Sequence, residues 1–258
     1  MSVTRGKFLR SLGSALPGLV LGTGVAAAQA LANKVAAVAG EKITPAPIPA
    51  SREETEKIPF IHSGPAEGNR VALTFDDGPN PGVSEYILDA LRERNVHATF
   101  FMIGEKVAAW PDLARRVVAE GHEIANHTWT HLNLTAIPDP QVEEEIHKTQ
   151  VVIGDVLQQQ AVWFRPPMGM LRRDQAPLLK REGLGIVFWS VITGDWAEIG
   201  ENKIVDIILT ETQPGSIIVC HDIHQQTADS LPRAIDGLRE RGFDLVTVST
   251  LLGNNSHA

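Results

Sequence analysis

From residue 70 onward, short apolar segments alternate with longer amphipathic ones. Short apolar runs predict buried strands, and runs with an apolar residue every three or four positions predict helices. The predicted strands cover residues 71–75, 98–103, 122–125, 162–165, 186–192, 216–220 and 244–248. The predicted helices cover residues 84–94, 112–120, 139–159, 174–182, 203–210 and 230–241. About seven β/α repeats indicate an α/β fold with a parallel sheet, either open or closed into a barrel.

The first thirty residues have the pattern of a secretory signal. Arg5, Lys7 and Arg10 precede an uncharged run rich in Ala, Gly and Leu, and residues 28–30 (AQA) have the small-x-small form of a cleavage site. We expect residues 1–30 to be a signal peptide and the protein to be exported to the periplasm or secreted. Residues 4–10 (TRGKFLR) resemble a twin-arginine signal that lacks the second arginine, and an ordinary Sec signal is the alternative.

The segment that follows the signal is rich in proline. Residues 31–69 contain five prolines and a run of charges, which predicts an extended linker without a core of its own. The compact domain is then expected over residues 70–252, with residues 253–258 as a tail. An uncleaved N-terminal anchor is a further alternative, but its Gly and Pro content makes it a poor membrane span. We therefore expect no stable membrane span after signal cleavage.

Composition excludes some classes of protein. The 258 residues are 43% hydrophobic and 21% charged, which describes a globular core and not a disordered chain. The formal net charge of −8 argues against binding to nucleic acid, which requires a basic surface. A single cysteine excludes an internal disulfide.

Polar residues recur at the ends of the predicted strands. In a β/α barrel the carboxyl ends of the strands converge on one mouth, so residues from separate segments are expected to meet there. The residues at these ends are Asp76, Asp77, His127, Arg165, Asp195 and His221. This convergence is the main physical indication of an active site.

Two of these segments offer metal ligands. A catalytic zinc site uses about three protein ligands from His and carboxylate and leaves a position for water. His127 and His131 would lie on one face if their segment were a helical turn, and an aspartate could supply the third ligand. Taken alone, Asp76-Asp77 before Gly78 would more simply be a turn cap, and His127 a buried core histidine.

Five segments, in this order, resemble the motifs of the polysaccharide deacetylases, carbohydrate esterase family 4 (CE4). The resemblance extends from about residue 70 to residue 252. It implies a distorted (β/α) barrel of about seven parallel strands that forms a single catalytic domain. The five segments are residues 74–79 (TFDDGP), 127–131 (HTWTH), 165–169 (RPPMG), 195–196 (DW) and 218–222 (IVCHD).

The resemblance implies a role for each motif residue on the metal side of the site. Asp77, His127 and His131 would hold a divalent metal. Zinc suits this ligand set best, and cobalt, nickel or manganese could also bind. Asp76 would be the general base that takes a proton from the attacking water, and Arg165 would pair with Asp76.

The resemblance also implies the groups that act on the substrate. His221 would protonate the departing amine, and Asp195 would orient His221 and favour its charged form. A backbone N–H near Pro167 and Met168 would bind the developing oxyanion. The residues expected to contact the sugar are Pro167, Met168, Trp196 and Trp129.

Two positions depart from the family pattern. Met168 stands where many members have an aromatic residue, so a face for stacking on a sugar ring is lost. Ile192 stands where many members have an acid ahead of the Asp-Trp pair, so any role of that acid is in doubt here. Neither departure affects the expected ligands, base or acid.

These features predict an exported, metal-dependent hydrolase that removes N-acetyl groups from polymers containing N-acetylglucosamine. Its substrate would be chitin oligomers or peptidoglycan, and we expect the protein to be a monomer. One alternative keeps the site but acts on O-acetyl esters, as on xylan. Another is a non-catalytic carbohydrate-binding relative, although such proteins usually lack a ligand or the base.

Overall fold

Strands and helices alternate along residues 58–253, the part of the chain that this computed structural model describes. All the strands in this part join one sheet, and their pairings are parallel. The strands are β1 (Phe60–Ile61), β2 (Arg70–Asp76), β3 (Thr99–Met102), β4 (Glu123–Asn126), β5 (Trp163–Phe164), β6 (Gly185–Val187), β7 (Val191–Ile192), β8 (Ile217–His221) and β9 (Asp244–Val246). The predicted α/β class is confirmed.

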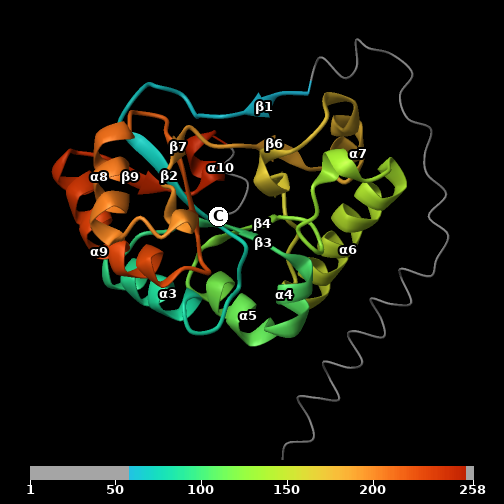
Figure 1. Cartoon of the computed structure of the whole chain (residues 1–258), viewed down its shortest axis with the longest axis horizontal. Helices are drawn as coiled ribbons and strands as arrows, with labels where there is room; N and C mark the ends of the chain where they lie inside the picture. The colour runs from blue at the N-terminus through green and yellow to red at the C-terminus, as the bar shows by residue number, and fades with distance from the viewer. Residues whose placement is uncertain (1–57, 254–258) are drawn as a thin grey trace, which may run out of the picture.

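Helices surround the sheet, with α8 and α9 on the left of Figure 1 and α6 and α7 on its right. The short helices α4 and α10 are additions to the helices that the sequence predicts. The α-helices of the described residues are α3 (Ser84–Glu93), α4 (Gly104–Ala109), α5 (Pro111–Ala119), α6 (Asp139–Leu157), α7 (Ala176–Arg181), α8 (Glu201–Glu211), α9 (Gln225–Glu240) and α10 (Val248–Leu251).

The sheet curls into an incomplete barrel. Its strand order is β1-β6-β5-β4-β3-β2-β8-β7, with β9 beside β2. β6 and β7 are thus near opposite ends of the sheet, yet only Phe188, Trp189 and Ser190 separate them along the chain. Such a connection reaches about 14 Å at most, so the two ends of the sheet must approach each other. This arrangement confirms the distorted (β/α) barrel.

The predicted strand over residues 186–192 is in fact two strands. The N–H of Phe188 donates to the carbonyl of Ile61, whereas the N–H of Ser190 donates to the carbonyl of Ile217. The stretch therefore leaves one end of the sheet and joins the other within three residues. This change of partner is one reason why the described residues form nine strands and not about seven.

Strand β1 lies inside the stretch that the sequence predicts to be linker. Phe60 pairs with Ile186 in parallel, and its ring stacks on Phe188 at 5.4 Å between ring centroids. The chain thus joins the sheet before residue 70, because the apolar residues Phe60 and Ile61 form an edge strand beside β6. The predicted signal peptide (1–30), most of the predicted linker and residues 254–258 of the predicted tail lie outside the described residues.

The two faces of the sheet pack different cores. Val71, Leu73 and Phe75 of β2 join a large apolar cluster between the sheet and the helices. Ala72 points to the opposite face, into a smaller cluster inside the curl with Phe101 and residues of α10. Successive residues of a strand alternate between faces, so Thr74 and Asp76 also point inward.

None of the helices within residues 58–253 is long and apolar enough to cross a membrane.

Candidate active site

The first motif leaves the sheet at Asp77. Asp76 is the last residue of β2 and is only 3% exposed. Asp77 follows with a φ of 77°, in the left-handed region, and the peptide bond from Gly78 to Pro79 is cis. A Cβ on Gly78 would come within 1.9 Å of Asp222 Oδ2, so this turn requires glycine.

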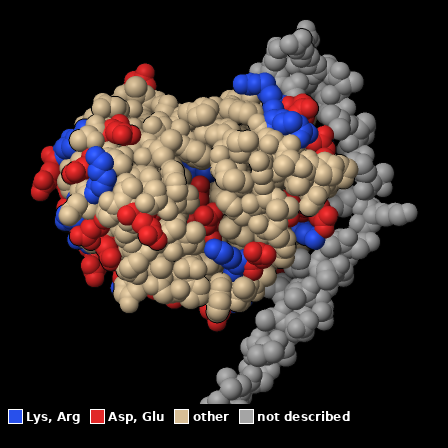
Figure 2. Space-filling model, viewed as in Figure 1, with Lys and Arg blue, Asp and Glu red and all other residues tan. Residues whose placement is uncertain are grey.

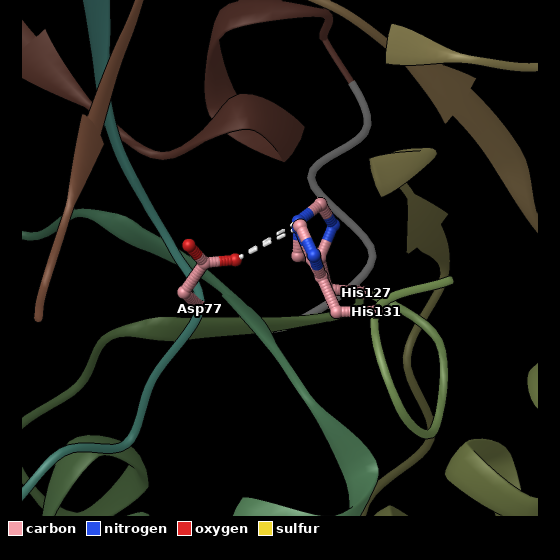
Figure 3. Close-up of side chains that lie close together, drawn as sticks. All are labelled: Asp77, His127 and His131. Carbon is pink, nitrogen blue, oxygen red and sulfur yellow. Dashed lines mark ion pairs between the residues drawn. The ribbon is translucent and has the colours of Figure 1, made fainter. Parts of the chain in front are cut away.

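Asp77, His127 and His131 form one cluster in which Asp77 points toward both imidazoles (Figure 3). Asp77 Oδ1 lies 3.4 Å from His127 Nε2 and 3.2 Å from His131 Nε2. The three ligand atoms lie within 4.8 Å of one another. Asp76 Oδ2 is 3.9 Å from His127 Nε2, which places the second carboxylate beside the cluster. The structure therefore brings together the three ligands that the sequence predicts.

The segment from His127 to His131 is a loop and not a helical turn, so the spacing of four residues does not by itself place the two histidines on one face. Thr128 and His131 have φ values of 67° and 62°, which exclude a right-handed helix. The side chain of Asn126 accepts from the N–H of Thr128 at 2.9 Å, and the hydroxyl of Thr128 accepts from the N–H of His131 at 3.1 Å. These side-chain contacts close a compact loop that still brings both imidazoles to one side.

The donor atoms fit a divalent cation. Asp77 Oδ1 is buried and accepts no hydrogen bond, and an orphaned buried oxygen facing two imidazole nitrogens is typical of a metal site. His127 Nδ1 lies 2.7 Å from the carbonyl of Arg165. That contact favours a proton on Nδ1 and leaves the Nε2 lone pair toward Asp77, as in histidines that bind metals.

Electrostatics within the cluster favour the protonation states that ligands require. Burial disfavours the Asp77 carboxylate, but the hydrogen bond and positive charge that His127 offers when protonated, with the charge of His131, outweigh burial and hold the pKa of Asp77 below its ordinary value. Burial, helped by His127, lowers the pKa of His131. An ionised aspartate beside a neutral histidine is the form that binds metal.

Arg165 pairs with Asp76 inside the curl. It follows β5, is fully buried, and its Nη1 donates to Asp76 Oδ1 at 2.6 Å and to the hydroxyl of Thr74 at 2.8 Å. Its Nη2 donates to the carbonyl of Phe188 at 2.9 Å, and the guanidinium lies 3.9 Å from the centroid of the Phe101 ring. The arginine therefore fixes Asp76 Oδ1 and leaves Oδ2 on the side of the cluster.

His221 and Asp195 form a second pair, from β8 and the 3₁₀ turn η4 (Asp195–Ala197). His221 Nδ1 lies 2.8 Å from Asp195 Oδ1, while Asp195 Oδ2 accepts from the His221 N–H and the Thr227 hydroxyl, both at 2.7 Å. Burial opposes the imidazolium, but the hydrogen bond and charge of Asp195 outweigh it and raise the pKa of His221 to about 9. The imidazole of His221 is therefore charged at neutral pH.

The residues expected to contact substrate lie in different surroundings. Met168, in the turn η2 (Pro167–Gly169), and Trp196 are 57% and 51% exposed, while Pro167 is buried. The ring of Trp196 stands edge-on to His221 at 5.4 Å. Trp129 instead packs against the main core, and a Cβ on Gly104 would lie 2.5 Å from its ring. Trp129 therefore packs beneath the histidine loop, whereas Met168 and Trp196 are exposed.

Figure 2 shows a hollow at the centre of one face, with acidic and basic atoms inside it and mainly uncharged surface around it. Exposed apolar side chains occur on the two segments that follow Arg165 and flank Asp195. They are Met168 and Met170 beside Arg165, and Ile192, Trp196 and Ile199 beside Asp195. The site thus combines a charged centre with an apolar, uncharged rim.

Two buried acids lie beside the loops that carry the predicted ligands, and the sequence did not predict a role for either of them. Glu145 on α6 accepts hydrogen bonds from the histidine loop. Asp222 accepts from the Ser84 hydroxyl at 2.6 Å and lies against Gly78, and burial raises the pKa of Asp222 to about 7. Asp222 follows His221 directly and could have been noticed in the fifth motif, whereas Glu145 is one of three consecutive glutamates and has no distinguishing signal.

A curled parallel sheet that gathers a His₂Asp cluster, an Asp–Arg pair and a His–Asp pair at its strand ends is typical of hydrolases built on β/α barrels. The family model for polysaccharide deacetylases matches residues 63–187. A chitooligosaccharide deacetylase of Rhizobium leguminosarum bv. trifolii is 39% identical over 208 residues, which cover 75% of this chain and 96% of the relative.

Two further relatives act, by their names, on peptidoglycan. The peptidoglycan-N-acetylglucosamine deacetylase PgdA of Listeria monocytogenes is 38% identical over 76% of this chain, which spans only 41% of that protein. The solved structure of the Bc1960 peptidoglycan N-acetylglucosamine deacetylase superposes with a TM-score of 0.76 at 32% identity, covering 81% of this chain and 99% of the other. This chain belongs to the polysaccharide deacetylase family, and the predicted enzyme class is confirmed.

Proposed function

We propose that this protein is a metal-dependent N-deacetylase that removes acetyl groups from N-acetylglucosamine residues of a polysaccharide. The observation that supports this proposal best is the complete set of groups around one mouth. Three ligand atoms, a carboxylate held by Arg165 and a charged His221 meet there, although they come from separate strand ends. Together these groups supply every role that hydrolysis of an acetamide requires.

In the proposed reaction, water attacks the acetyl carbonyl and the carbon–nitrogen bond breaks. A divalent metal held by Asp77, His127 and His131 would supply Lewis-acid activation of the water and the carbonyl. Asp76 accepts the proton of the water through Oδ2, because Arg165 occupies Oδ1. His221 donates its proton to the departing nitrogen, since Asp195 occupies its Nδ1 and leaves Nε2 free for the substrate. Acetate and a free amino sugar result.

Zinc is the proposed metal, because two imidazoles and one carboxylate with an open position are its usual catalytic ligands. The proposed oxyanion contact is a backbone N–H of the Pro167–Met168 turn, which follows Arg165 directly. Trp196 beside His221 is the proposed surface for a sugar ring. Chitin oligomers and peptidoglycan are the proposed substrates, because relatives are named for these two polymers.

Acetate release tests this function directly. Protein loaded with Zn²⁺ is incubated with chitooligosaccharides, peptidoglycan and acetylxylan, and acetate is measured with and without a chelator. We expect release from at least one N-acetylated polymer, loss with the chelator, and loss in Asp76→Asn and Asp77→Asn. Asp112→Asn, which changes an aspartate 97% exposed on α5, is the matched control and should remain active. Activity on acetylxylan alone would favour the O-acetyl esterase, and sugar binding without release would favour a non-catalytic relative.

Export is proposed from the sequence of residues 1–30. Sequencing the N-terminus of the mature protein from the periplasm or medium tests it. A start near residue 31 supports a cleaved signal, and a start at Met1 contradicts it.

A further inference from the structure

Glu145 holds the middle of the histidine loop from outside the sheet. It lies on α6 and is 7% exposed. The N–H groups of Trp129 and Thr130 donate to its Oε2 at 3.0 and 2.7 Å, and the hydroxyl of Thr130 donates to its Oε1 at 2.7 Å. Both carboxylate oxygens are thus occupied by residues that lie between His127 and His131.

The opposite side of the same loop is held by α4. The N–H of Gly104 donates to the carbonyl of Thr128 at 2.9 Å, and the N–H of Glu105 donates to the carbonyl of Trp129 at 3.2 Å. The ring of Trp129 fills the space where Gly104 has no side chain. The N–H groups of Trp129 and Thr130 therefore face Glu145, while the carbonyls of Thr128 and Trp129 face the first turn of α4.

The loop has a conformation that needs such support. Thr128 is β-branched and yet has a φ of 67°, and His131 has a φ of 62°. Left-handed backbone is unfavourable for a β-branched residue such as Thr128 and persists only where surrounding contacts impose it. If the contacts to Glu145 were lost, the loop could relax, and Nε2 of the two imidazoles would no longer converge on Asp77.

We propose that Glu145 is a positioning residue for the metal site, whose carboxylate sets the geometry of His127 and His131 and thereby the affinity for the ion. The inference rests on the proposed function, because it takes these histidines to be ligands. Residues outside the ligand set that orient metal ligands commonly change metal affinity by about 10- to 100-fold when they are replaced.

Zn²⁺ affinity of the folded protein, measured by competition with a chromophoric chelator, tests this role. In Glu145→Gln an amide nitrogen replaces one acceptor and faces a donor of the loop. We expect Zn²⁺ to bind about 10- to 100-fold more weakly, and the N–H groups of Trp129 and Thr130 to exchange with solvent faster. Glu144→Gln on the same helix removes only the surface pair of Glu144 with Lys148, and it should bind Zn²⁺ as the wild type does.

Thr130→Val provides a milder variant that loses only the hydroxyl contact, and it should weaken Zn²⁺ binding less than Glu145→Gln. If Glu145→Gln does not fold, the Zn²⁺ affinity of Thr130→Val alone tests the role of Glu145. Wild-type affinity in both folded variants, or in Thr130→Val alone where the other does not fold, would overturn the role of Glu145 while leaving the metal site intact. A wild-type protein that binds no Zn²⁺ would instead contradict the proposed function, and this inference with it.

Discussion

Replacing Asp195 by asparagine should convert His221 from a charged to a largely neutral side chain. Asp195 is fully buried, and its two oxygens accept from Nδ1 and the N–H of His221 and from the hydroxyl of Thr227. Asparagine keeps the shape and one acceptor but carries no charge. Burial of His221 remains, and burial alone disfavours the imidazolium. The pKa of His221 should therefore fall from about 9 to its ordinary value of 6.5 or below.

The size of the effect follows from this change. A rise from 6.5 to about 9 corresponds to about 3 kcal/mol of preference for the imidazolium. At pH 8 the charged fraction would fall from about 90% to about 3%, so kcat/KM should fall roughly thirtyfold if His221 must donate a proton. A raised pKa in the folded state also stabilises the fold below pH 6.5, and this contribution disappears as the pH rises through about 9. The variant should therefore lose about 3 kcal/mol of unfolding free energy at pH 6 and much less at pH 10.

Three measurements check this prediction. The alkaline limb of the pH profile of kcat/KM for acetate release should move from near pH 9 to about pH 6.5 or below. NMR titration follows the Cε1–H of His221, and urea unfolding is measured at pH 6 and 10. Glu198→Gln is the matched control, because it removes an exposed carboxylate that lies three residues after Asp195 in the chain. An unchanged His221 titration in Asp195→Asn would falsify the role given to Asp195. A normal shift with an unchanged rate profile would remove His221 as the acid.

Three further predictions concern Arg165 and Trp196 of the site and His122, a buried histidine directly before β4. Arg165→Met should lower the free energy of unfolding by about 3–5 kcal/mol, because Asp76 would remain buried without its partner, and urea unfolding near wild-type stability would contradict this pairing. Burial lowers the pKa of His122 to about 4, so the free energy of unfolding should fall by about 3 kcal/mol as the pH falls from 6.5 toward 4. This loss of stability in acid should be smaller in His122→Asn. Trp196→Ala should raise KM about twofold to tenfold with a smaller change in kcat, and an unchanged KM would remove this ring from the substrate surface.

The alternation of strands and helices was readable from the sequence because the central strands β2, β3 and β8 are buried on both faces and the longer helices have one apolar side. The curl of the sheet was not readable, because it depends on contacts between segments that are distant in sequence. Residues 186–192 show this limit. Their apolar run is typical of a single strand, yet the N–H groups of Phe188 and Ser190 bind to opposite ends of the sheet. Only the partners Ile61 and Ile217 reveal the division.

The polar residues of the site were identifiable because parallel strands bring their carboxyl ends to one mouth. Asp77, His127 and His131 meet as that rule requires. The local conformation was less predictable. The spacing of the two histidines suits a helical turn, but Asn126 and the hydroxyl of Thr128 provide hydrogen bonds that favour a loop. Glu145 was invisible because a helical glutamate is ordinarily solvated, and its burial depends on the fold.

The backbone at Asp77 explains how two adjacent acids can serve the same mouth. In a regular strand, neighbouring side chains point to opposite faces, so Asp77 would be expected to turn toward the helices when Asp76 points into the curl. Instead, the strand ends at Asp76, and Asp77 has a φ of 77° that redirects its carboxylate toward His127 and His131. Asp76 keeps the direction of the strand and meets Arg165. The turn at Gly78, which has room only for a glycine against Asp222, follows immediately and holds this change of direction in place. The division of the pair into a proposed base and a proposed ligand is therefore a consequence of where the strand stops.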